Sequence, residues 1–103
     1  MKFSKEKPAI FERLHKAFGV EWGKSLVIAY GDTIYHSEPL DPSLIVHEAI
    51  HLQRQGKNPD EWYNKYIQDE KFRFGEEILA YRAQYKFLKD ITKDRNHLAR
   101  SLY

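Results

Sequence analysis

The residues of this chain most suited to chemistry are two histidines, His47 and His51, the first and last residues of the segment HEAIH. On a helix, residues four apart lie one above the other with Cβ atoms about 5–6 Å apart, so both imidazoles can bind one metal ion. Glu48 lies one position round the same helix, where it can act as a general base without ligating the metal. The motif therefore predicts metal-dependent hydrolysis, with His47 and His51 as ligands and Glu48 as the catalytic base.

A third ligand is needed, because a catalytic zinc ion usually has three protein ligands and an open or water-filled fourth position. Zn²⁺ is the expected cofactor, since neutral imidazole and carboxylate oxygen suit it. The chain contains no cysteine, so every ligand must be a histidine, aspartate or glutamate. The pattern HExxHxxGxxH would supply a further histidine, but Arg54 stands at the glycine position and Lys57 at the last histidine position.

A final helix, expected from about Arg73 into residues 88–100, carries the acidic alternatives Glu76 and Glu77. Helical phase places Glu77 close to the apolar face of this helix and turns Glu76 toward its polar side. A carboxylate on an apolar face is costly to bury unless it meets a cation. Glu77 is therefore the predicted third ligand, with Glu76 as the alternative. The apolar face consists of Phe74, Ile78, Tyr81, Tyr85 and Leu88.

Two helices have clear start signals. The helix that carries the motif should begin after Asp41 as its N-cap, with a proline in the first turn, and should end at Gly56. The next should begin after Asn58, followed by Pro59, with Glu61 placed to complete a capping box. The motif helix is apolar nearly all round, so we expect it to be buried in the middle of the domain.

The part of the chain before the motif is expected to form one helix and one β-hairpin. The helix should begin at Pro8 and end at Gly19. Two short apolar runs, residues 26–30 and 33–36, are separated by a Gly-Asp pair that suits a tight turn. This hairpin is the only clear β signal. The predicted fold is a single α+β domain over residues 1–103, mostly helical with about four helices and one hairpin or small antiparallel sheet.

Composition limits the classes of function. The chain has 17 basic and 15 acidic residues for a net charge of +2, and the two signs are interspersed, which argues against a nucleic-acid partner. No signal peptide and no membrane-length apolar run is visible, so the expected location is the cytoplasm, without membrane association. A domain of this size buries a modest core, so a metal can matter to folding as well as activity. A monomer is the expected state.

The order of hairpin, HExxH helix and later glutamate helix resembles the gluzincin branch of the zincin metallopeptidases, and the short length resembles the minimal members called minigluzincins. The resemblance covers roughly residues 26–88. It implies that His47, His51 and Glu77 bind zinc and that Glu48 is the base and proton shuttle. Gluzincins often carry an acidic residue four positions after the ligand glutamate, whereas this chain has Tyr81 there.

The expected activity is hydrolysis of peptide bonds by metal-activated water. A donor is also needed to stabilise the developing oxyanion, and Tyr81, Tyr35 and His36 are candidates. The hairpin edge could bind an extended peptide substrate as an added strand. The alternative is a catalytically silent binding or regulatory module that keeps the metal. Retention of Glu48 favours the enzyme, because a structural zinc site would be closed by a fourth protein ligand.

Overall fold

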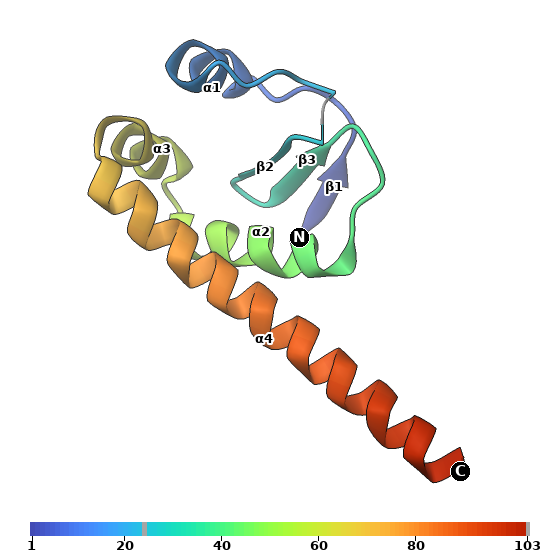
Figure 1. The fold of residues 1–103 in the computed structure, drawn as a ribbon. Helices are drawn as coiled ribbons and strands as arrows, with labels where there is room; N and C mark the ends of the chain where they lie inside the picture. The colour runs from blue at the N-terminus through green and yellow to red at the C-terminus, as the bar shows by residue number, and fades with distance from the viewer. Residues whose placement is uncertain (24, 103) are drawn as a thin grey trace.

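The computed structural model describes residues 1–23 and 25–102, with side chains described as far as Lys93. Within this part, four helices accompany a small sheet, as predicted (Figure 1). No described helix is both long and apolar enough to cross a membrane. In chain order the elements are β1 (Lys2–Ser4), α1 (Phe11–Phe18), β2 (Val27–Tyr30), β3 (Thr33–His36), α2 (Pro42–Gln55), α3 (Pro59–Gln68) and α4 (Glu70–Leu102).

The sheet has three strands in the order β1-β3-β2 and is mixed rather than purely antiparallel. β2 and β3 form the predicted hairpin, with Tyr30 opposite Thr33 on either side of the two-residue turn. β1 pairs parallel to β3, with Phe3 opposite Ile34. This strand was not predicted, because three residues in a charged N-terminal segment give no period-two pattern and their pairing depends on a distant partner.

The ends of the three shorter helices follow the predicted signals with one exception. Asp41 accepts a hydrogen bond from the Ser43 amide at the start of α2, and Asn58 accepts one from the Glu61 amide at the start of α3. α1 begins at Phe11 rather than at Pro8, although the Pro8 carbonyl already accepts a hydrogen bond from the Phe11 amide. The helix ends at Gly19 in a left-handed conformation with φ of 70°, as expected for a C-cap glycine.

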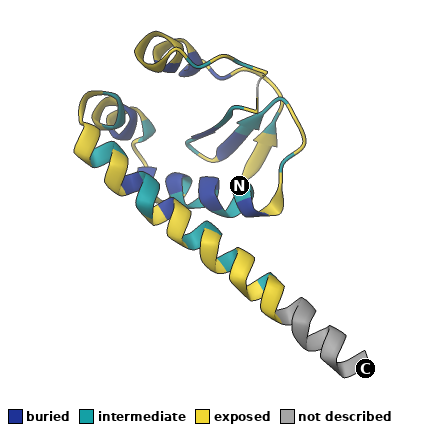
Figure 2. Ribbon diagram, viewed as in Figure 1, coloured by how far each residue is buried: buried dark blue, intermediate teal, exposed yellow. Residues whose placement is uncertain are grey.

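α4 begins three residues earlier than predicted, at Glu70, and its predicted apolar face is wrong. The aromatic residues and the leucine of that face are exposed to solvent. Figure 2 shows that much of the described part of α4 is coloured as exposed. α4 instead packs on α2 through a face that includes Ala80, which is fully buried, and Glu76. The exposed residues are Phe74, Tyr81, Tyr85 and Leu88.

α2 lies between the sheet and α4 and therefore forms the centre of the molecule, as predicted (Figure 1). An apolar cluster joins α1, β2 and α3 beside it: Ile10, Phe11, Leu14, Ile28, Trp62 and Tyr63. The C-terminal part of α4 extends beyond the other elements, which accounts for a long axis of 54 Å against 27 and 25 Å for the other two. The central position of α2 brings one of its faces against α4 and another against β2.

Candidate metal centre

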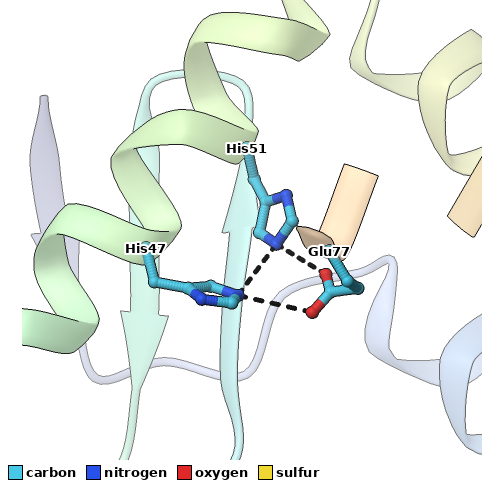
Figure 3. Close-up of side chains that lie close together, drawn as sticks. All are labelled: His47, His51 and Glu77. Carbon is cyan, nitrogen blue, oxygen red and sulfur yellow. Dashed lines mark hydrogen bonds and ion pairs between the residues drawn. The ribbon is translucent and has the colours of Figure 1, made fainter. Parts of the chain in front are cut away.

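Three side chains from two helices converge at the contact between α2 and α4 (Figure 3). His47 and His51 project from successive turns of α2, and their Nε2 atoms lie 3.2 Å apart. Glu77 reaches them from α4, with Oε1 2.7 Å from His51 Nε2 and Oε2 3.4 Å from His47 Nε2. Their potential ligand atoms all lie within 4.8 Å of one another, which is close enough to bind one metal ion.

The donor atoms of this cluster suit a cation better than they suit each other. When both Nε2 atoms are deprotonated, as metal binding needs, their lone pairs face each other 3.2 Å apart, an arrangement that a bound cation stabilises. In a tetrahedral site with zinc–nitrogen distances of about 2.0–2.1 Å, two ligand nitrogens lie about 3.3–3.4 Å apart. The observed separation is therefore close to that of a metal pair. Both rings are buried, so the protein fixes this geometry.

The charge of Glu77 is stabilised by its two partners. Burial alone would raise the pKa of this carboxyl group, but hydrogen bonds and charge interactions with His47 and His51 lower it to about 2. The pKa of His47 shifts in the opposite direction. Burial lowers the pKa of His47, yet hydrogen bonding to Glu77 and the charges of Glu48 and Glu77 raise it overall. The site thus attracts positive charge at neutral pH.

Glu48 lies in the same region without joining the cluster of potential ligands. Its side chain is buried, with 8% of its surface exposed, and it lines the same cavity as His47, His51 and Glu77. Burial raises its pKa from 4.5 to about 7, against the opposing effect of the two histidines. A carboxyl group with a pKa near neutrality can both accept and return a proton at neutral pH.

The outer nitrogens of the two histidines have different surroundings. His47 Nδ1 lies 3.0 Å from Gln84 Oε1, and the Gln84 amide in turn donates to Ser43 Oγ at 3.2 Å. A donating Nδ1–H leaves the Nε2 lone pair directed at the cluster, which is the tautomer that metal binding needs. His51 Nδ1 is buried and has no hydrogen-bond partner among the described residues. Its ring instead packs against Trp62, with centroids 5.4 Å apart.

Sequence reasoning missed this Gln84–Ser43 pair, although its spacing was a usable signal. Gln84 follows Glu77 by seven residues, or two helical turns, and Ser43 precedes His47 by four. Both therefore share a helix face with a residue of the cluster. The position four after Glu77, where gluzincins often carry an acid, is occupied by Tyr81.

Glu76 has a separate set of partners and is buried, although the sequence places it toward the polar side of the helix. Only 3% of its surface is exposed. Its Oε2 accepts from Arg54 Nε at 2.7 Å, and its Oε1 accepts from Trp62 Nε1 at 2.9 Å. These bonds join α4 to both α2 and α3. Of the two neighbouring acids, Glu77 is therefore the one beside the imidazoles, and Glu76 connects the helices.

A cavity of about 150 Å³ opens beside the cluster. Tyr66 of α3 lines it, and its hydroxyl donates to Glu77 Oε1 over 3.4 Å. Burial and the negative charge of Glu77 raise the pKa of this hydroxyl, so it is a protonated donor at neutral pH. Tyr66 was not predicted as a site residue. Much of the remaining lining is apolar and includes Leu14, Phe18, Val20, Leu26 and Ile28.

The three residues predicted as oxyanion donors differ in their distance from the cluster. Tyr81 packs edge-on against His47 with ring centroids 4.5 Å apart, and it is 58% exposed. Tyr35 lines a surface hollow near Pro8, and His36 Nδ1 bonds the Glu38 carbonyl. None of the three lines the cavity beside the cluster, which instead contains Tyr66.

Comparisons of the chain with models of known protein families, with curated protein sequences and with solved structures give no match.

Proposed function

We propose that the protein is a zinc-dependent hydrolase of peptide bonds in which His47, His51 and Glu77 hold the metal. One observation carries the proposal: three potential ligands from two helices converge beside a cavity that also contains Glu48. A structural zinc site would be closed by a fourth protein ligand and would not need this buried acid. The resemblance of the HExxH motif and later glutamate to gluzincins supports the same reaction.

The roles follow from the surroundings of each side chain. Zinc bound at this site would lower the pKa of a water molecule and polarise the substrate carbonyl. Glu48 would accept the proton of the attacking water and return it to the leaving amine, because its buried carboxyl group lines the same cavity as the three potential ligands. Tyr66, whose hydroxyl lies beside Glu77, would donate a hydrogen bond to the developing oxyanion. Gln84 would hold His47 in the tautomer that binds metal.

The cavity suits part of a peptide. Its apolar wall can receive an aliphatic or aromatic side chain, while the cluster and Glu48 form the polar side. β2 contributes to the same wall and lies at the edge of the sheet, where an extended backbone could pair with it. A peptide with an apolar residue next to the cleaved bond is therefore the favoured substrate.

The test combines metal analysis with cleavage of a mixed peptide library by wild type, Glu48→Gln and the control Glu70→Gln. Glu70 is an exposed acid in the first turn of α4. We expect one zinc per chain in all three proteins, with cleavage by wild type and the control only. Zinc in all three without any cleavage would support the metal-containing binding module instead. Absence of zinc from wild type after loading would overturn both proposals.

Replacing Tyr66 by phenylalanine tests the oxyanion donor separately. Loss of one such donor typically lowers kcat by about 10²–10³-fold. The metal content should not change, because the hydroxyl contacts Glu77 only at 3.4 Å. Tyr85→Phe is the matched control, since Tyr85 is 65% exposed on α4. An unchanged kcat in Tyr66→Phe would remove this residue from the mechanism.

A further inference from the structure

The two halves of the β2 edge differ. β2 is the outer strand of the sheet, and residues Leu26 to Ala29 line the cavity beside the metal cluster. The backbone groups of alternate residues in an edge strand point away from the sheet. Ala29 and Val27 are two residues apart, so their backbone groups point to the same side. The outward backbone carbonyl of Ala29 is already hydrogen-bonded within the protein, whereas the described residues provide no such bond at Val27.

At Ala29 the edge is closed. Its carbonyl oxygen accepts hydrogen bonds from Gln55 Nε2 at 2.7 Å and from the Tyr63 hydroxyl at 2.5 Å, which use both of its lone pairs. Gln55 also accepts from the Gly31 amide at 2.9 Å, so its side chain bridges the end of β2 and the hairpin turn. Ala29 is 1% exposed. A peptide cannot continue along the strand past this point.

Neighbouring contacts reinforce the closure. The Tyr30 hydroxyl donates to Asp60 Oδ1 at 2.7 Å, which joins the last residue of β2 to the start of α3. The rings of Tyr30 and Tyr63 stack with centroids 6.0 Å apart. Both α2 and α3 are therefore fixed to this end of the strand by side-chain contacts.

At Val27 the edge is open. Val27 is partly exposed and lines the cavity, and the hydrogen bonds that occupy the Ala29 carbonyl have no counterpart there among the described residues. Ser25, two residues before Val27, has a φ of 60°, so the extended conformation of β2 does not reach back to Ser25. A peptide can therefore pair with the strand around Val27 and leave the cleft at that end only.

The direction of pairing decides which end of the peptide meets the closure. Antiparallel pairing is the more stable arrangement per residue, and it would run the peptide from the Ala29 end toward the Val27 end. The amino terminus of the substrate would then lie at the closed end. We propose that this site acts on the amino-terminal end of peptide chains and removes one or a few residues at a time. The inference rests on the proposed peptidase function.

The reaction is an ordinary hydrolysis near the amino terminus. Water adds its oxygen to the carbonyl carbon, the C–N bond of that peptide unit breaks, and Glu48 transfers the water proton to the leaving amine. The products are a short amino-terminal fragment with a new carboxylate and the remaining chain with a new amino terminus. No oxidant or further reactant is needed.

The test uses one apolar ten-residue peptide attached directly to a small folded domain, either at the peptide's carboxyl end or at its amino end. With the amino end free, we expect cleavage within the first few residues, located by mass spectrometry. With the amino end blocked by the domain, we expect cleavage to fall by at least about tenfold. Equal cleavage of both fusions at an internal bond would overturn the inference, and so would preferential cleavage of the fusion with a free carboxyl end.

If no peptide is cleaved, that result counts against hydrolysis itself. The one-ended cleft is then tested by measuring peptide binding. Zinc-loaded Glu48→Gln would be titrated with the same two fusions, each labelled with a fluorophore on the folded domain, and binding followed by anisotropy. At least about tenfold tighter binding of the fusion with a free amino end would support the one-ended cleft. Equal affinities, or no measurable binding of either fusion, would contradict it.

A variant examines the closure directly. Gln55→Ala combined with Tyr63→Phe removes both hydrogen bonds to the Ala29 carbonyl. We expect this protein to discriminate less between the two fusions than wild type does. Tyr85→Phe is the matched control and should discriminate as wild type does, because Tyr85 is exposed on α4. Unchanged discrimination in a folded double variant would show that these bonds do not close the cleft.

Discussion

Two neighbouring glutamates of α4 have different surroundings. Glu77 is partly exposed and faces two imidazoles, whereas Glu76 is buried and bonded to Arg54 and Trp62. The first set of contacts leaves room for a cation and opens on a cavity, and the second is complete without one. Of these adjacent carboxylates, Glu77 is therefore expected to bind a metal ion and Glu76 to stabilise the fold. Four predictions test this division.

The largest expected effect is on metal binding by Glu77→Gln. The amide keeps the shape of the side chain but removes the charge that offsets a divalent ion. We expect zinc affinity to fall by more than about 100-fold, beyond the 10–100-fold typical of residues that only orient a ligand. Competition with a chromophoric chelator measures it.

Glu76→Gln in the same assay should bind zinc nearly as wild type does. If instead Glu76→Gln loses the metal and Glu77→Gln keeps it, the roles given to the two acids are reversed.

The second prediction concerns pH in the metal-free protein, which should be less stable at pH 8 than at pH 5. Burial raises the pKa of Glu48 from 4.5 to about 7, so the folded state holds a proton that the unfolded state releases, and stability falls across that range. His47 adds to the loss as the pH rises through its folded pKa, which lies above 6.5. Glu77, with a pKa of about 2, contributes at both pH values and loses its contribution only below about pH 4.5.

Urea unfolding in the presence of a chelator measures this difference, which should be on the order of 3 kcal/mol. Glu48→Gln should remove most of it, and Glu76→Gln should retain it. Added zinc should reverse the trend, because the ligands must lose their protons to bind. A metal-free protein that gains stability from pH 5 to pH 8 would contradict the description of Glu48 and His47.

The third prediction is a loss of stability in Glu76→Gln. Neutralising the buried carboxylate leaves Arg54 without its counter-charge and weakens the bond to Trp62. We expect the free energy of unfolding to fall by about 1–3 kcal/mol. Each kcal/mol corresponds to a Tm decrease of about 4–8 °C in a domain of this size. Gln53→Ala, at an exposed position of α2, is a control that should change little. A Tm equal to that of wild type would show that the buried contacts are dispensable.

The smallest expected effect is that of Gln84→Leu on zinc affinity. Removing the amide leaves His47 Nδ1 without its partner at 3.0 Å, so the metal-binding tautomer is less favoured. We expect a loss of about tenfold. Gln84→Glu should retain or increase the affinity, because a carboxylate accepts the same hydrogen bond. If leucine and glutamate have equal effects, Gln84 acts through packing alone.

The sequence predicted elements whose signals are local. Caps such as Asp41 and Asn58, the Gly-Asp turn and the spacing of His47 and His51 all depend on a few neighbouring residues. β1 could not be predicted, because its pairing with β3 joins residues about 31 positions apart.

The face of α4 that packs against the rest of the molecule also could not be predicted from the local sequence pattern. An apolar stripe was expected to be the buried face, whereas Tyr81 and Tyr85 are exposed and Ala80 is buried. Close packing against α2 favours a small residue at the contact, and the hydrogen bonds of Glu76 satisfy a charge that would otherwise be costly to bury. Glu77 nevertheless lies beside the imidazoles, because successive residues of a helix point in different directions. Glu76 points to Arg54 and Trp62 instead.

Trp62 contacts both the metal cluster, through His51, and the buried Glu76. Its indole packs against His51 on one side and donates a hydrogen bond to Glu76. Indole emission responds to nearby charge and to the polarity of its environment, so this residue is an intrinsic fluorescent reporter within the molecule. Titration with a colourless cation could be followed at this position without any label. The second tryptophan, Trp22, packs against Phe11 of α1, and a Trp22→Phe protein would isolate the Trp62 signal.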